Sequence, residues 1–159
     1  MDILTQQLVN GLVLGSIYAL VALGYTMVYG ILELINFAHG EVTMIGAMVA
    51  LTVIGVLVGV APELPGILVV LGGILVAIPA CMLLAFGIEK IAYRPLRKAP
   101  RLAPLITAIG ISIILQNLAM LIWGRQYVSF PEILPTSKYE FLGAHISVLQ
   151  ISIVVLAVA

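Results

Sequence analysis

The sequence has 159 residues, of which 63% are hydrophobic and 9% are charged, and its formal net charge is zero. Soluble domains carry roughly 25% charged residues, so this composition excludes a water-soluble globular protein and indicates an integral membrane protein. The single cysteine, Cys81, excludes an internal disulfide framework and a cysteine-based metal site. We expect Cys81 to be a small buried hydrophobic residue within an apolar run.

Four apolar stretches are long enough to cross a membrane as helices, since about 20 residues span a hydrocarbon core of about 30 Å. They cover residues 8–30, 42–61, 67–88 and 102–124, and a shorter fifth stretch covers 146–159. None alternates between apolar and polar residues as a membrane β-strand does. We therefore predict an all-α, polytopic transmembrane helix bundle with four full spans and a truncated fifth, forming a single transmembrane domain over residues 1–159.

Small residues recur at helical spacing in the first two predicted helices. The glycines among them are Gly11 and Gly15 in the first helix and Gly46, Gly55 and Gly59 in the second. Such spacing lets helix backbones approach closely in lipid, so we expect these glycines to pack helices together. Glycine is also common in transmembrane helices for other reasons. In the third helix, Pro79 is expected to produce a kink or a functional break.

The connection between the first two predicted helices, residues 31–41, reads ILELINFAHGE and mixes apolar with strongly polar residues. Six of its eleven residues are apolar, too many for a solvated loop. Its polar side chains belong to Glu33, Asn36, His39 and Glu41. Irregular backbone at membrane depth is tolerated only where it is buried in protein or faces water, and ionisable groups there are functional candidates. We therefore predict a re-entrant or interfacial segment.

Four residues of this segment are candidates for lining a substrate pathway: Asn36, His39, Gly40 and Glu41. Asn36 both donates and accepts hydrogen bonds, His39 changes charge near neutral pH, and Gly40 permits a turn or a close backbone contact. A purely structural interpretation is equally open, in which the polar groups only satisfy the backbone of a tight turn. The two interpretations do not exclude each other.

Five of the seven basic residues lie within twelve positions, between the third and fourth predicted helices. Short loops rich in Lys and Arg stay on the cytoplasmic side, so we predict that the loop 89–101 is cytoplasmic. Pro95 and Pro100 are expected to interrupt any helix there. The loop either orients the chain beside anionic lipid headgroups or docks a cytoplasmic partner. The residues that would serve either role are Arg94, Pro95, Arg97, Lys98 and Arg101.

The fourth predicted helix carries hydrogen-bonding side chains in an apolar background. They belong to Thr107, Ser112, Gln116 and Asn117. Ser112 and Gln116 are four residues apart and share one helix face. Because polar groups in lipid usually bond to neighbouring helices, interhelical bonding is the favoured role, with Gln116 and Asn117 kept as pathway candidates. The predicted interfacial aromatic belt consists of Trp123, Tyr127 and Tyr139.

The sequence contains almost none of the residue patterns that are typical of an enzyme active site. There is no G-x-x-x-x-G-K-[ST] segment for nucleotide phosphates, no H-E-x-x-H segment and no cysteine and histidine spacing for a metal. We therefore expect a protein that is not an enzyme and that binds no metal or cofactor of its own. We also expect no nucleic-acid partner.

Three stretches resemble a known family. They are GSIYALVALGYTMVYGILELINFAHGEVTMIGA, IEKIAYRPLR and LITAIGISIILQN, and they closely resemble the permease subunit of branched-chain amino acid ABC importers, the LivH type. The family motif maps onto Asn36, Ala38, His39 and Gly40, and the signature of the basic loop maps onto Arg94, Pro95 and Arg97.

The resemblance implies a permease of about eight helices in the bacterial inner membrane, paired with a second, homologous permease. Two cytoplasmic P-loop ATPase subunits would bind and hydrolyse the ATP, and a periplasmic protein would deliver leucine, isoleucine or valine. Because such permeases are about twice as long, we expect this sequence to be the N-terminal half. Two alternatives remain open: an ion-coupled secondary transporter with Glu33 and Glu41 as coupling groups, and a membrane assembly subunit that conducts nothing.

Overall fold

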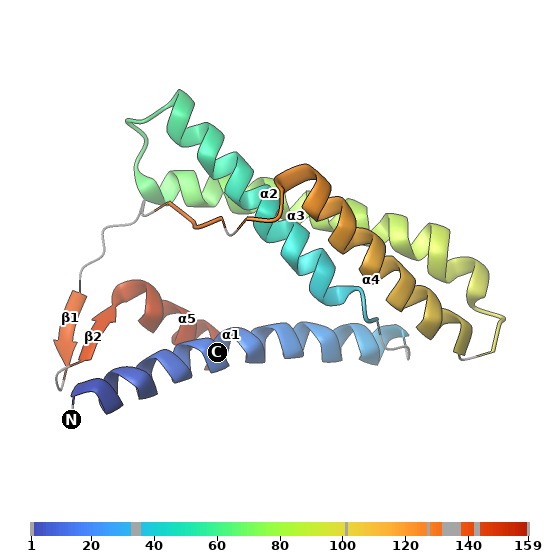
Figure 1. Cartoon of the computed structure of the whole chain (residues 1–159), viewed down its shortest axis with the longest axis horizontal. Coiled ribbons are helices and arrows are strands. Elements are labelled where there is room, and N and C mark those ends of the chain that lie inside the picture. The colour runs from blue at the N-terminus through green and yellow to red at the C-terminus, as the bar shows by residue number, and fades with distance from the viewer. Residues whose placement is uncertain are drawn as a thin grey trace. The chain divides into compact units, whose positions relative to one another are not determined.

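The computed structural model of the chain describes residues 2–32, 36–100, 102–126, 128–131, 138–141 and 144–158. The chain forms two compact units, one made of residues 1–31 and 134–159 and the other of residues 32–133. Among the described residues, four helices are long and apolar enough to cross a membrane (Figure 1). The predicted polytopic, all-α fold with four full-length spans is therefore confirmed.

The first unit contains a long helix, a short hairpin and a short helix. Its elements are α1 (Asp2–Leu32), β1 (Lys138–Phe141), β2 (Ala144–Ser147) and α5 (Val148–Val158). The two strands pair antiparallel, with Lys138 opposite Ser147. Ser147 also caps α5, because its Oγ accepts from the Gln150 N–H at 3.2 Å while Gln150 Oε1 accepts from the Ser147 N–H at 3.0 Å.

The second unit contains the other three long helices. They are α2 (His39–Val60), α3 (Gly66–Ile88) and α4 (Leu102–Trp123), with a π-helical turn, η1 (Glu89–Tyr93), and a 3₁₀ turn, η2 (Arg94–Leu96), after α3. The α-helix α3 is continuous through Pro79. Gly124 ends α4 with φ +83° and its N–H bonds the Met120 carbonyl at 3.0 Å, a conformation that glycine adopts without strain.

The predicted loop 89–101 is helical for more than half its length, which corrects the sequence interpretation. Pro95 does not interrupt the helical path, because it lies within η2 while the α-helix has already ended at Ile88. The π-helical turn before it changes the hydrogen-bonding pattern, so the missing Pro95 N–H falls where the chain tightens into a 3₁₀ turn. The bends and turns between the helices begin only after Leu96.

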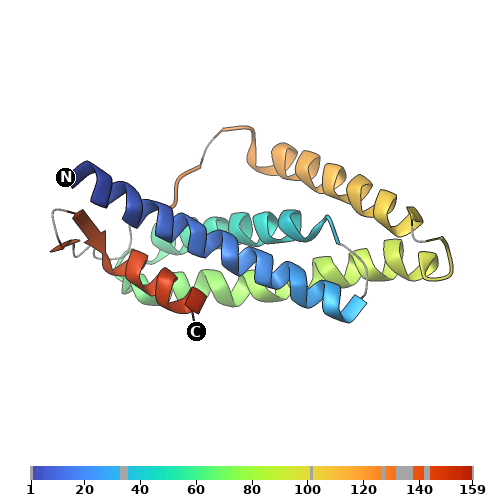
Figure 2. The same cartoon turned by 90° about the horizontal axis from the view of Figure 1, so that it is seen from below.

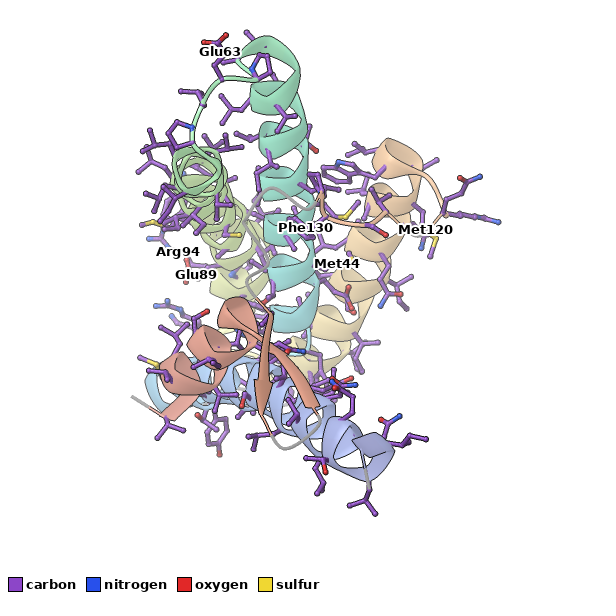
Figure 3. The ribbon with its side chains drawn as sticks, turned by 90° about the vertical axis from the view of Figure 1, so that its left-hand side faces the viewer. Met44, Glu63, Glu89, Arg94, Met120 and Phe130 are labelled. Atoms are coloured by element: carbon purple, nitrogen blue, oxygen red, sulfur yellow. The ribbon has the colours of Figure 1, made fainter. Side chains whose placement is uncertain are left out.

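The second unit is held together by α2, which lies between α3 and α4 (Figure 3). Helices α2 and α3 run antiparallel, since Gly46 of α2 lies beside Cys81 while Ile54 and Leu57 lie beside Gly73 and Gly72. Gly46, Ile54, Val69 and Gly73 are buried in this unit. Small residues therefore bring these two backbones together, which is the usual way helices associate in lipid.

Candidate functional site

Glu41 forms a hydrogen-bonded cluster between α2 and α4. Its Oε1 accepts a hydrogen bond from Ser112 Oγ at 2.9 Å and from Gln116 Nε2 at 2.7 Å. Glu41 lies in the first turn of α2, where the helix dipole stabilises a negative charge. The cluster thus provides an acidic side chain with two neutral donors and a helix N-terminus, and the cluster contains no basic side chain.

A second contact between α2 and α4 fixes their relative direction. Trp123 Nε1 donates to Thr52 Oγ1 at 2.8 Å, and Thr52 Oγ1 in turn donates to the Met48 carbonyl. Both the Glu41–Ser112 pair and the Thr52–Trp123 pair are 71 residues apart, so the two helices run parallel in constant register. Eleven residues make just over three helical turns, which places Glu41 and Thr52 on the same side of α2.

Asn36 connects the beginning of α2 with the end of the α3 helix. Its Oδ1 accepts from the Ala38 N–H at 3.0 Å and from the Tyr93 hydroxyl at 2.7 Å. Its backbone carbonyl accepts from the His39 N–H at 3.1 Å. Ala38, at the N-cap position of α2, offers no side-chain cap. Asn36 therefore satisfies backbone donors that the helix start leaves open and, at the same time, binds η1.

His39 and Gly40 belong to α2, which begins three residues earlier than the sequence predicts. The half-buried His39 accepts a hydrogen bond from Thr43 Oγ1 at its backbone carbonyl, at 3.1 Å. Gly40 is exposed, and a Cβ added there would meet no described atom within 4 Å. Only Asn36, Phe37 and Ala38 form the described part of the connecting turn, and Glu33 lies outside the described residues.

This connecting turn is recessed relative to the ends of α4 and of the α3 helix, as two independent contacts show. Glu41 faces residues 10 and 14 positions after Leu102, so α4 extends about 15 Å beyond the start of α2. Cys81 lies beside Val42 and Gly46, and the helical path continues from Cys81 to Leu96, again about 15 Å beyond the start of α2. The two views in Figures 1 and 2 agree with this offset. We call residues 36–38 the recessed turn.

The polar side chains of α4 have different partners. Gln116 and Ser112 reach Glu41, whereas Asn117 Nδ2 donates to the Ile113 carbonyl of its own helix at 2.8 Å. Thr107 Oγ1 likewise donates to its own helix, at the Ala103 carbonyl. Among the pathway candidates, the structure therefore brings Gln116 to Glu41 and leaves Asn117 on another face of α4.

The basic residues after α3 lie on and after the two helical turns. Arg97 Nη2 forms an ion pair with Glu89 Oε1 at 2.6 Å, and Lys90 Nζ lies 5.8 Å from the centroid of the Phe86 ring. Arg94, Pro95, Arg97 and Lys98 are exposed, and Arg101 lies outside the described residues. The described basic residues thus form an accessible positive surface, residues 94–98, which we call the basic turn.

The predicted packing glycines have unequal surroundings. An added Cβ at Gly46 would overlap Cys81 Sγ, far inside ordinary contact distance. An added Cβ at Gly55 or Gly59 would meet no described atom of the same unit within 4 Å, and the same holds for Gly11 and Gly15 in theirs. Among the predicted packing glycines, only Gly46 therefore makes a close contact with the described part of its own unit.

Several residues of these contacts were absent from the predicted site. Tyr93 is not among the predicted site residues, yet its hydroxyl donates to Asn36 Oδ1. A Cβ added at Gly72 or Gly73 would lie 2.9 Å from a side-chain atom of Leu57 or Ile54, respectively, and the adjacency of these two glycines in an apolar run was an available signal. For Tyr93 no sequence signal existed, because the contact joins residues 57 positions apart.

The comparisons with known proteins agree on one family. The family model described as the permease component of the branched-chain amino acid transport system matches residues 7–159. The high-affinity branched-chain amino acid transport system permease protein BraD of Pseudomonas aeruginosa is 46% identical over 155 residues, covering 94% of this chain and 50% of the relative. The corresponding permease protein LivH of Escherichia coli K12 is 48% identical over 128 residues, covering 80% of this chain and 41% of the relative.

LivH of Salmonella typhimurium shows the same identity and coverage as the Escherichia coli protein. The chain thus spans about half the length, or less, of the curated relatives it matches. No solved structure matches it. Since the family model covers all but the first six residues, the chain belongs to the family of permease components of branched-chain amino acid transport systems.

Proposed function

We propose that this chain forms part of the permease of an ABC importer that carries leucine, isoleucine and valine across the bacterial inner membrane. The observation that carries the proposal is the family match over residues 7–159. In this proposal residues 1–159 belong to one transmembrane permease domain. ATP is hydrolysed by two separate cytoplasmic subunits, a second homologous permease completes the pathway, and a periplasmic protein delivers the amino acid. The chain itself catalyses no covalent reaction and holds no cofactor.

The polar groups at the start of α2 support a pathway role for this region. A branched-chain amino acid has an apolar side chain, which suits apolar helix walls, and a zwitterionic backbone, which needs polar partners. The Glu41 carboxylate uses Oε1 for both helix donors, so its other oxygen is the one left to accept from an ammonium group. We assign the pathway to Asn36, His39, Gly40, Glu41, Gln116 and Asn117.

The basic turn supports the proposed orientation. The helical path from α3 ends in the basic turn, where Arg94, Arg97 and Lys98 are exposed before α4 begins. Clusters of positive charge in short loops are retained on the cytoplasmic side of the membrane. The loop 89–101 is then cytoplasmic, and the basic turn faces either the anionic headgroups or the ATPase subunits. The recessed turn opens toward the same side.

Leucine uptake by the full-length protein with its partner subunits tests the proposal. Uptake into cells lacking other leucine importers is measured after ATP depletion and, separately, after collapse of the ion gradients by an ionophore. We expect loss of uptake in the first case only. Uptake that survives ATP depletion and stops with the gradients would establish a secondary transporter instead.

Variants in the same assay test the assigned residues. We expect Asn36→Ala, His39→Ala and Glu41→Gln to reduce uptake at unchanged expression. Glu63→Gln is the matched control for Glu41→Gln, because it removes the same charge from an exposed position in the turn after α2. If Asn36→Ala and His39→Ala leave uptake, expression and ATP hydrolysis unchanged, the segment has no transport role.

A further inference from the structure

We propose that Tyr93 is a positioning residue that couples the basic turn to the start of α2 through its hydrogen bond with Asn36. The inference rests on the proposed function, since it concerns how ATP-driven movement would reach the pathway. Tyr93 immediately precedes the basic turn, and its hydroxyl lies 2.7 Å from Asn36 Oδ1. This bond is a side-chain link between the η1 turn and the recessed turn.

Asn36 Oδ1, the acceptor in this bond, already accepts two hydrogen bonds. An amide oxygen has two lone pairs, and Asn36 Oδ1 uses one for the Ala38 N–H and the other for the Tyr93 hydroxyl. Ala38 is completely buried, at 0% exposure, so water has little access to its N–H, whereas the bond between Tyr93 and Asn36 is part-buried. Movement of Tyr93 therefore changes the hydrogen bonding of the group that caps α2.

The helical path that carries Tyr93 changes its winding at this residue. Residues Glu89–Tyr93 form a π-helical turn and Arg94–Leu96 a 3₁₀ turn, so a wide turn is followed by a tight one. Such π turns are uncommon and are often found at functional sites. A return of Glu89–Tyr93 to α-helical pairing would rotate the Tyr93 side chain about the helix axis and take its hydroxyl away from Asn36.

The recessed position of the turn makes the hydrogen bond between Tyr93 and Asn36 important for supporting its backbone. The recessed turn adjoins the start of α2, which lies about 15 Å inside the ends of the neighbouring helices, where non-helical backbone has to be supported by protein or by enclosed water. Glu41 follows Asn36 by five residues and is tied to α4. A displacement of the basic turn thus reaches α2 at Asn36 and α4 at Glu41 by contacts that the structure contains.

Tyr93→Phe in the full-length permease with its partners, reconstituted in proteoliposomes, tests this inference, because the substitution removes only the hydroxyl. We expect the number of leucine molecules imported per ATP hydrolysed to fall by roughly two- to tenfold, the range for loss of one hydrogen bond, with unchanged assembly. Tyr29→Phe in α1 is the control, since its hydroxyl has no hydrogen bond to a described residue. Tyr93→Phe combined with Asn36→Leu should be no worse than Asn36→Leu alone, because both remove the same contact.

Hydrogen–deuterium exchange of the same variants tests the contact without relying on transport. In Tyr93→Phe, we expect the amides of residues 36–43 to exchange roughly two- to tenfold faster, with those of residues 52–60 unchanged. Unchanged exchange at residues 36–43 overturns the proposed contact. Faster exchange with an unchanged leucine-to-ATP ratio overturns the coupling role. If the wild-type assembly imports no leucine, the proposed function fails, and exchange still decides whether Tyr93 controls the start of α2.

Discussion

Gly46→Ala should destabilise the second unit because it inserts a methyl group into the contact between α2 and α3. The new Cβ would overlap Cys81 Sγ, whereas comfortable contacts of heavy atoms lie near 3.5–4.0 Å. The thiol or the helix backbones would therefore have to move. Cys81 has one side-chain torsion, and its Sγ already lies 3.6 Å from the Val42 carbonyl, so rotation of the thiol also gives up that weak bond.

The expected free-energy cost of this overpacking is roughly 1–3 kcal/mol. Alanine is a better helix former than glycine by about 1 kcal/mol, which partly offsets the cost in Gly46→Ala. Gly55→Ala, in the same helix, receives the same propensity gain, and its Cβ meets no described atom within 4 Å. The difference between the two variants therefore isolates the steric cost, and we expect Gly46→Ala to be roughly 1–3 kcal/mol less stable than Gly55→Ala.

The measurement is reversible unfolding of the full-length protein in mixed micelles by SDS titration, followed by helical circular dichroism. Cys81→Ala removes the clashing sulfur, so Gly46→Ala combined with Cys81→Ala should recover most of the loss. A Gly46→Ala protein as stable as Gly55→Ala would refute the packing argument. So would a double variant in which the two losses simply add, because residues in contact are expected to couple.

Three further predictions use the same titration. Glu41→Ala should cost about 1–3 kcal/mol because it leaves its two α4 donors without an acceptor, while Glu41→Gln keeps an oxygen there and should cost less; equal losses would contradict the contact. Trp123→Phe should lower the free energy of unfolding by about 0.6 kcal/mol. Adding Thr52→Val to the same protein should lower it no further, since both changes remove the same hydrogen bond. Arg97→Ala should cost less than about 1 kcal/mol, because its ion pair with Glu89 is largely exposed; a larger loss would show that the pair anchors the basic turn.

The long helices could be predicted from the sequence because a run of about 20 apolar residues has to satisfy its backbone internally in lipid. Their ends were less predictable, and the start of α2 shows why. His39, Gly40 and Glu41 are polar or small, so hydropathy assigned them to the connection, but they continue the backbone hydrogen bonding of the helix. Polarity and helicity are separate properties. Pro95 shows the same limit, because a 3₁₀ turn accommodates it within the helical path.

Only those features of the candidate site that depend on one helix could be predicted from the sequence. The spacing of Ser112 and Gln116 predicted one shared face, and the structure confirms that both reach a neighbouring helix. That the acceptor is Glu41 depends on the register between α2 and α4, which no local pattern encodes. The Tyr93–Asn36 bond likewise depends on how far the path from α3 extends beyond the start of α2.

The two sides of α2 explain how one helix serves both packing and polar contacts in an apolar environment. Toward α3 it presents Gly46 and Ile54, where close backbone approach provides the attraction. Toward α4 it presents Glu41 and Thr52, which bond to α4 side chains through polar atoms. A carboxylate at such a position is retained only if donors satisfy it. Because the α4 donors both use Oε1 of Glu41, the helix contact does not involve the other carboxylate oxygen, so the structural interpretation of this residue and its proposed pathway role need not compete.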